Sequence, residues 1–244
     1  MKRTFGDLHL HLNGKGFIHG AHLARKAAEL GYRLIAAPLA PETKSQEIQH
    51  FKTAFANEGI DFAARVDLQP RTQNELLCSL RRLRRKFEVI CVLCTNKEVA
   101  RQAAKDRRVD LLNFPLCDYR RRFFDHAEAE LASTGVAEFE VDIKPLLILQ
   151  GSARVRLLSY LRREINLCSE FHVPVVVSSG VSRPLLLRKP REMALLSSLF
   201  GLPNNSQLDS VSLNPVKIVE RNRKKLKKEF IAPEIRLVKQ GENQ

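Results

Sequence analysis

Strand-like and helix-like segments alternate along almost the whole chain, with short connections between them. Seven apolar runs of strand length cover residues 4–12, 33–38, 60–68, 88–94, 109–114, 137–143 and 175–179. Each run is followed by residues whose apolar positions recur with helical spacing, and Thr72 with Glu75 forms the start signal of one such helix. This alternation indicates parallel strands joined by right-handed crossovers. We therefore predict an α/β fold, a TIM-type barrel of seven to eight parallel strands with extra C-terminal helices, in preference to an open doubly wound sheet.

The length of 244 residues suits one large α/β domain, because barrels of this size commonly stay undivided. We predict a single domain over residues 1–231 and a polar C-terminal tail over residues 232–244. No apolar run reaches the roughly 20 residues that a membrane span needs, and the first residues lack the apolar stretch of a signal peptide. The sequence therefore predicts a cytoplasmic protein that does not bind membranes.

The chain is strongly basic. It has 41 lysines and arginines against 27 acidic residues, which gives a formal net charge of +14. A domain this basic is more often a nucleic-acid-binding protein than a metabolic enzyme. A merely solubilising surface of the thermophile type is the alternative, but that type usually adds Glu along with Lys, and Glu is not in excess here. The composition therefore favours a polyanionic partner.

The end of the seventh predicted strand gathers groups that suit phosphate binding. The apolar residues 175–177 lead into Ser178, Ser179 and Gly180, and cations follow at Arg183, Arg188, Lys189 and Arg191. Backbone amides, hydroxyls and guanidinium groups are the usual ligands of phosphate. No general base or nucleophile pair accompanies them, so the segment is predicted to hold a polyanion and not to cleave it.

Two further basic clusters flank the fifth predicted strand. Arg107 and Arg108 precede the strand, and Arg120, Arg121 and Arg122 follow it beside aromatic residues. Arginine next to aromatic rings can pair with phosphates and stack on bases. Three consecutive arginines cannot all find acidic partners in a chain with so few acids. A third basic run, at residues 221–228, is less specific because such runs are usually solvated.

The first predicted strand carries Asp7, His9 and His11 on one face, since alternate residues of a strand point to the same side. His-x-His at the start of a βα barrel resembles the polymerase-and-histidinol-phosphatase (PHP) family of metal-dependent phosphoesterases. Acidic residues of later strands could join this face, namely Asp67, Asp110, Glu138, Glu140 and Asp142.

A metal centre of that kind needs further histidines from later strands. Where PHP enzymes resemble one another in carrying Asp-x-His, the seventh strand here ends in Ser-Ser-Gly. We therefore expect no metal or other cofactor on the protein itself. A centre built from Asp7, His9, His11 and Glu140 is the alternative.

Several ordered motifs carry a specific family resemblance. They read Asp-Arg-Arg-Val-Asp-Leu-Leu-Asn-Phe-Pro at 106–115, Phe-Asp-His-Ala-Glu-Ala-Glu-Leu-Ala at 124–132, Glu-Val-Asp-Ile-Lys-Pro-Leu-Leu at 140–147, Val-Pro-Val-Val-Val-Ser-Ser-Gly at 173–180, Ser-Leu-Asn-Pro at 212–215 and Ile-Val-Glu-Arg-Asn at 218–222. This set resembles the protein component 3 family of archaeal ribonuclease P, homologous to the eukaryotic thirty-kilodalton subunit. The resemblance covers nearly the whole chain.

The resemblance implies a PHP-like barrel and a role in removing the 5′ leader from precursor tRNA. It also implies a catalytic ribonuclease P RNA that the protein helps to fold, with the reactive magnesium bound to that RNA. A second protein, component 2, is the implied protein partner, in a heterotetramer with two copies of each chain. One feature departs from the resemblance. The first strand of this family is not expected to carry a set of residues as close to a metal-ligand pattern as Asp7, His9 and His11.

We therefore expect a non-catalytic subunit of ribonuclease P that contacts RNA through the basic clusters named above, with Ser178, Ser179 and Gly180 shaping a phosphate pocket. The alternative is a stand-alone metal-dependent phosphoesterase or nuclease. A third hypothesis is a basic scaffold that binds structured RNA without specificity.

Overall fold

The computed structural model describes residues 3–12, 16–115, 123–227, 230–232 and 235–236. Its main sheet has seven parallel strands that follow one another in chain order. They are β1 (Gly6–Asp7), β2 (Leu34–Pro38), β3 (Asp61–Leu68), β4 (Val89–Leu93), β5 (Leu111–Asn113), β6 (Glu138–Asp142) and β7 (Val175–Ser178). The predicted α/β barrel of parallel strands is thereby confirmed.

The residues that follow β1 and β7 bring the two edges of the sheet together. Leu10 forms a parallel bridge with Val181. The amide of Gly180 donates to the carbonyl of His9 (2.9 Å), and the amide of His11 donates to the carbonyl of Val181 (2.9 Å). These bonds close the barrel at the end where the strands finish, called the C-terminal end below.

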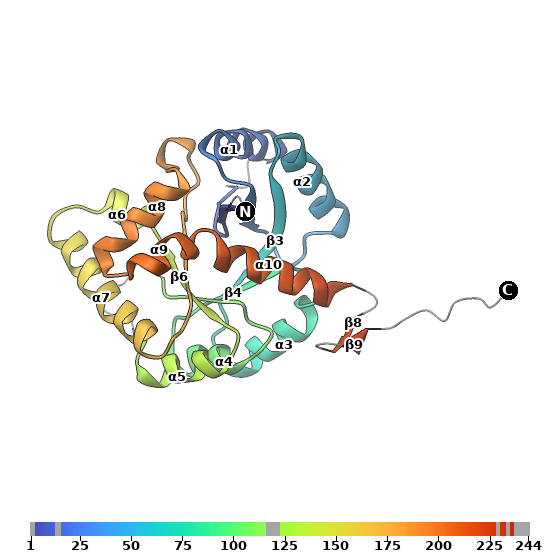
Figure 1. Ribbon diagram of the computed structural model, residues 1–244. Coiled ribbons are helices and arrows are strands. Elements are labelled where there is room, and N and C mark those ends of the chain that lie inside the picture. Colours follow the sequence, from blue (N-terminus) through green and yellow to red (C-terminus); the bar gives the residue numbers. More distant parts are fainter. Residues whose placement is uncertain (1–2, 13–15, 116–122, 228–229, 233–234, 237–244) are drawn as a thin grey trace.

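Helices cover the outside of the barrel (Figure 1). They are α1 (Gly16–Leu30), α2 (Ser45–Asn57), α3 (Gln73–Leu83), α4 (Lys97–Lys105), α5 (His126–Thr134), α6 (Lys144–Ile148) and α7 (Gly151–Glu170). Alternate strand residues such as Ile35, Phe62 and Phe139 point outward and are fully or almost fully buried with the helices in one core cluster. Burying such side chains stabilises a fold by about 1.5–3 kcal/mol each, which holds the helical layer on the sheet.

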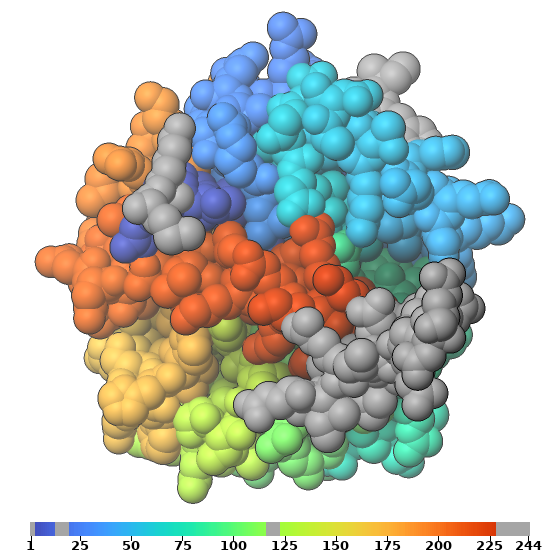
Figure 2. All heavy atoms as spheres, turned by 45° about the vertical axis from the view of Figure 1, so that its right-hand side comes forward, coloured from blue at the N-terminus to red at the C-terminus, as the bar shows by residue number. Residues whose placement is uncertain are grey.

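The C-terminal region supplies the predicted extra helices, η2 (Pro184–Leu186), α8 (Pro190–Leu196), η3 (Ser197–Phe200), α9 (Asn204–Ser210) and α10 (Leu213–Leu226). Helix α10 crosses the end at which the strands begin, called the N-terminal end below (Figures 1 and 2). Ile218 and Val219 of α10 pack against interior residues such as Leu34, Val89 and Leu111. An apolar plug therefore fills that half of the barrel.

The first strand differs from the prediction of one straight run over residues 4–12. Only Gly6–Asp7 is regular strand, and the chain bends at Leu8. Leu8 packs with the interior cluster, whereas Leu10 belongs to the outer core, so the two leucines do not share a face. The guanidinium of Arg65 donates to the Leu8 carbonyl (2.8 Å), which fixes the bend.

The predicted division of the chain at residue 231 stays a prediction. In that region Phe230–Ala232 (β8) pairs antiparallel with Ile235–Arg236 (β9). Among the described residues, each helix is either too short or too polar to cross a membrane.

Candidate functional site

The C-terminal half of the barrel interior is polar. Alternate residues of parallel strands point inward, and this register brings charged or polar side chains of several strands into the interior. They are Arg65 and Asp67 of β3, Asn113 of β5, Glu140 and Asp142 of β6 and Ser178 of β7, with His9 from the segment after β1. This polar interior is where a barrel enzyme normally places its reactive groups.

Arg65 is the central cation of the polar interior and has no exposed surface. Its Nη1 and Nη2 lie 2.6 and 2.7 Å from the two carboxylate oxygens of Glu140. Its Nε donates to Asp67 Oδ1 at 2.6 Å. Such a bidentate arginine–carboxylate pair is stronger and geometrically more defined than a single hydrogen bond. The guanidinium therefore has a carboxylate on each side and cannot reach solvent.

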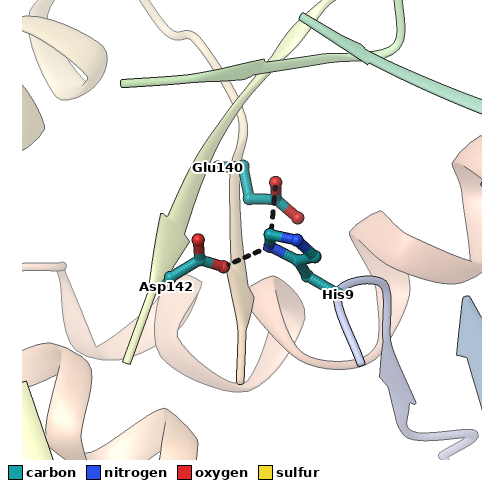
Figure 3. Close-up of side chains that lie close together, drawn as sticks. All are labelled: His9, Glu140 and Asp142. Carbon is teal, nitrogen blue, oxygen red and sulfur yellow. Dashed lines mark hydrogen bonds and ion pairs between the residues drawn. The ribbon is translucent and has the colours of Figure 1, made fainter. Parts of the chain in front are cut away.

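His9 is the second cation (Figure 3). Its Nδ1 lies 2.8 Å from Asp142 Oδ1, and its Nε2 lies 3.3 Å from Asp67 Oδ2. Burial and the Arg65 guanidinium disfavour a charged imidazole, but the carboxylates of Asp142 and Asp67 outweigh them and raise the pKa of His9 to about 10. His9 is therefore an imidazolium at neutral pH.

His11 lies next to His9, with ring centroids 4.3 Å apart. Burial and the positive charge of His9 lower the pKa of His11 to about 4. His11 is thus a neutral imidazole at physiological pH. The two histidines of the His-x-His motif therefore carry different charges, although both were candidates for the same metal centre.

The pKa values of the interior carboxyl groups also shift in opposite directions. Burial would raise the pKa of Asp67 and of Asp142, but the nearby cations Arg65 and His9 hold both below their ordinary range. Burial raises the pKa of Asp7, although its Oδ1 accepts from the backbone amides of Ser179 (3.0 Å) and His9 (3.1 Å). The cations Arg65 and His9 thus face the carboxylates of Asp67, Glu140 and Asp142, and the polar interior largely neutralises itself.

A divalent metal ion does not fit this arrangement. Donor atoms of His9, Glu140 and Asp142 lie within 4.8 Å of one another, the one such group among the described residues. However, His9 Nδ1 already lies 2.8 Å from Asp142 Oδ1, and a metal ion would have to displace the proton between them. Both oxygens of Glu140 already accept from Arg65, and they also accept from Ser178 Oγ (2.7 Å) and Asn113 Nδ2 (2.9 Å). A metal ion there would also lie close to a buried guanidinium.

A cavity of about 460 Å³ adjoins the polar interior at the C-terminal end. His11, Asp67, Asp142 and Lys144 line it together with apolar side chains such as Leu93 and Leu149. The two carboxylates are balanced by the charges of His9 and Lys144, so the cavity carries no excess of positive charge for a phosphate group.

Comparison with known proteins identifies the family. The family model described as RNase P subunit p30 matches residues 4–227. The chain belongs to the ribonuclease P subunit p30 family. It is therefore a protein subunit of ribonuclease P, a tRNA-processing ribonucleoprotein, as the motifs predicted.

Curated relatives agree with this assignment. The chain is 30% identical over 166 residues to ribonuclease P protein component 3 of Methanosarcina acetivorans, a match that covers 68% of this chain and 69% of the relative. It is 28% identical over 222 residues to the component 3 of Methanococcoides burtonii, covering 91% and 90% of the two chains.

Solved structures show the same fold. A chain of an archaeal ribonuclease P, solved by cryo-EM with mature tRNA, superposes with a TM-score of 0.83 at 18% identity, covering 98% of this chain and 100% of that chain. A putative prolidase from Bifidobacterium longum superposes with a TM-score of 0.56 at 14% identity, covering 90% and 70% of the two chains. The p30 barrel is thus shared with proteins of different function, and its activity must be argued from its own residues.

Ser178 and Ser179 do not present an open phosphate pocket. Both side chains are buried: Ser178 Oγ donates to Glu140, and Ser179 Oγ donates to the carbonyl of His9 (3.3 Å). Gly180 has φ +62° and approaches Asp142 so closely that an added Cβ would lie 2.9 Å from its Cγ. The three residues close the barrel and support the polar interior. A role in RNA binding stays a prediction.

The predicted basic residues lie in different parts of the molecule. Arg183, Lys189 and Arg191 are exposed after β7, whereas Arg188 is half-buried and donates to the carbonyls of Leu185 and Leu187. Arg107 is exposed and Arg108 pairs with Asp106 (2.6 Å), both next to the start of β5 at the N-terminal end. Arg120, Arg121 and Arg122 lie outside the described residues. The described cations of this set therefore do not converge on one pocket.

Arg65 was missed by the sequence reasoning, although a signal for it exists. Asp61, Ala63, Arg65 and Asp67 alternate along one strand, so the period that indicated Asp67 also places Arg65 inside the barrel. An arginine was not predicted there because acids and histidines, and not arginines, are metal ligands.

Proposed function

We propose that this ribonuclease P subunit acts by binding RNA and not by catalysis within its own barrel. The observation that carries the proposal is the Arg65 guanidinium, which is held by both oxygens of Glu140 in the half of the barrel where such enzymes place their reactive groups. His9, protonated between two carboxylates, is also unsuited to act as a general base at neutral pH. The net charge of +14 supports an RNA partner.

The partners belong to the same proposal. They are the ribonuclease P RNA, precursor tRNA and a second protein of the component 2 type, assembled as two copies of each protein. Exposed apolar side chains of the described surface, such as Val155, Leu185 and Leu195, offer contact area for a protein. Magnesium would be bound by the RNA, and the protein itself would need no cofactor. We also propose that the assembly is cytoplasmic.

The proposal is tested by reconstituted cleavage of precursor tRNA with the RNA and the partner proteins, with and without this chain. The chain should increase the cleavage rate at limiting magnesium, because its cations lower the repulsion between RNA phosphates. The His11→Ala variant should retain that effect, because neutral His11 makes no ion pair among the described residues. Loss of cleavage in His11→Ala with RNA affinity intact would contradict the proposal and favour a metal-dependent reaction in the barrel.

Assembly is measured separately. The mass of the complex formed by the purified chain and its component 2 partner should correspond to two copies of each. A one-to-one mass would contradict the stoichiometry while leaving RNA binding unaffected.

A further inference from the structure

Three elements bring basic side chains together at the N-terminal end of the barrel. They are the end of α3, the turn between α4 and β5, and the last turns of α10, which crosses this end (Figure 2). The residues are Arg81, Arg84, Arg85, Arg107, Arg221 and Lys225, called the N-terminal basic patch below. Arg81, Arg85 and Arg107 are exposed, and the other three are half-buried.

Hydrogen bonds fix the centre of this patch. Arg84 Nη1 donates to Asp110 Oδ2 (2.6 Å) and to the carbonyl of Arg108 (3.1 Å). Arg221 Nη2 donates to the other oxygen of the same carboxylate, Asp110 Oδ1, at 3.0 Å. Two guanidinium groups from distant parts of the chain are thus held on one aspartate, and the backbone of Arg108 adjoins them.

The positive charge of the patch exceeds its negative charge. Asp110 is shared by two arginines, and in the described part of the chain Arg81, Arg85, Arg107 and Lys225 form no ion pair with a carboxylate. Half-burial and the guanidinium groups of Arg221, Arg84 and Arg107 lower the pKa of Lys225, while Asp110 opposes them. The ammonium group therefore lies among like charges that the protein does not fully neutralise.

We propose that the N-terminal basic patch is an RNA-binding surface that contacts the phosphate backbone. This inference rests on the proposed RNA-binding function and names the surface that performs it. The guanidinium groups of Arg84 and Arg221, held by hydrogen bonds, form a preorganised centre. Arg107 and Lys225, which have no carboxylate partner among the described residues, gain one when a phosphate binds. Binding would release counterions from the RNA and would be strongly salt-dependent.

The surface is suited to the backbone of folded RNA and not to reading unpaired bases. Base recognition in single strands relies on exposed aromatic rings for stacking. Among the phenylalanines and tyrosines whose burial is described, none is exposed, and Phe87 beside the patch is fully buried. Phosphate contacts orient a protein on RNA but carry little sequence information.

The cavity at the C-terminal end is a less favourable place for the same partner. There the cations Arg65 and His9 are buried and paired with Asp67 and Asp142, which leaves Lys144 as the remaining cation of the cavity lining among the described residues. In the patch, in contrast, Arg81, Arg85 and Arg107 are exposed, and a phosphate can reach them without disturbing the core.

The test measures binding of the full-length chain to in vitro transcribed ribonuclease P RNA over a series of salt concentrations. Arg107→Gln/Lys225→Gln removes two charges from the patch. Arg25→Gln/Lys26→Gln removes two charges from α1, which lies on the opposite side of the barrel from α4 (Figure 1). Among the described residues, Arg25 and Lys26 form ion pairs with Glu29 alone. Thermal unfolding of each variant verifies that it is folded.

The patch variant should bind at least about tenfold more weakly at physiological salt, and the slope of log affinity against log salt should become less steep by about two. The α1 variant should stay within about twofold of the wild type. Equal affinity and slope in the patch and α1 variants would overturn the proposal. A loss confined to a third variant, Arg183→Gln/Lys189→Gln, would overturn it as well, but would leave RNA binding by this chain intact. No preference of the wild type for this RNA over an unrelated structured RNA would contradict the proposed function itself.

Discussion

The two ends of the barrel use charge in opposite ways. In the C-terminal half, cations and carboxylates face one another in the interior: Arg65 lies against Glu140 and Asp67, and His9 lies between Asp67 and Asp142. At the N-terminal end, Arg84 and Arg221 share Asp110, while Arg107 and Lys225 add charge without a carboxylate partner in the described chain. A buried charge must find a partner because desolvation is costly, whereas a surface cation can stay unpaired. Only the unpaired charges are available to a ligand.

Removing the central interior cation should have the largest effect on stability. Arg65→Met leaves Glu140 buried without its guanidinium partner, and breaking a buried ion pair in this way costs about 3–5 kcal/mol. Denaturant unfolding measures the loss. The double variant Arg65→Met/Glu140→Gln should regain part of the loss, because residue 140 then no longer carries a buried charge without a partner. If Arg65→Met lowered the free energy of unfolding by less than about 1 kcal/mol, the stability of the fold would not depend on pairing between the interior charges.

The protonated state of His9 should make stability depend on pH. Its pKa of about 10 in the folded chain lies above the ordinary value of 6.5. The stabilisation from its charge is therefore fully present below pH 6.5 and is lost as the pH rises towards 10. The free energy of unfolding of the wild type should exceed that of His9→Gln by an amount that shrinks by a few kcal/mol between pH 6.5 and 10. A difference that stays constant over this range would show that His9 is neutral.

Closure of the barrel should be sensitive to Gly180. Its φ of +62° is strained for other residues, and an added Cβ would lie 2.9 Å from Asp142 Cγ. Gly180→Ala is expected to destabilise the fold by roughly 1–3 kcal/mol. Thermal unfolding would show this as a lowered Tm. Gly201→Ala is the matched control, because that glycine also has a positive φ (+85°) but its Cβ would meet nothing within 4 Å. If both variants lowered the Tm equally, backbone strain alone would explain the effect, and the contact with Asp142 would contribute nothing.

The surface cations should affect stability least. Arg107→Gln is expected to change the free energy of unfolding by no more than about 0.5 kcal/mol, since the exposed side chain has no carboxylate partner in the described chain. Denaturant unfolding at low salt is the measurement. A destabilisation above 1 kcal/mol would mean that this charge serves the fold, and the contrast between the two ends would be lost.

The sequence predicted the barrel because period-two strands and capped helices recur along it, and these are local signals. Thr72 does accept a hydrogen bond from the amide of Glu75 (3.2 Å), as the capping pattern indicated. The bend at Leu8 was not predictable from local pattern, because it depends on Arg65, which lies 57 residues further along the chain. The opposite charge states of His9 and His11 depend on carboxylates of β3 and β6 for the same reason.

The candidate site was predicted less well than the fold. The run of Ser178, Ser179 and Gly180 has the residue types of a phosphate loop. However, the two serine hydroxyls are buried and donate to Glu140 and to the His9 carbonyl. The basic residues 221–228 were interpreted as a solvated run, yet Arg221 is tied to Asp110 and Arg223 to Asp61 and Glu88. Residue type indicates what a side chain can bind, while the tertiary structure decides whether it is already occupied.

Calorimetric titration of Mn²⁺ into the purified full-length chain tests most directly whether the interior charges neutralise each other. Since Arg65 and His9 already serve as the counter-ions of Glu140, Asp67 and Asp142, we predict no saturable binding and the same trace for His9→Gln. One equivalent of Mn²⁺ bound by the wild type and lost in His9→Gln would contradict this account.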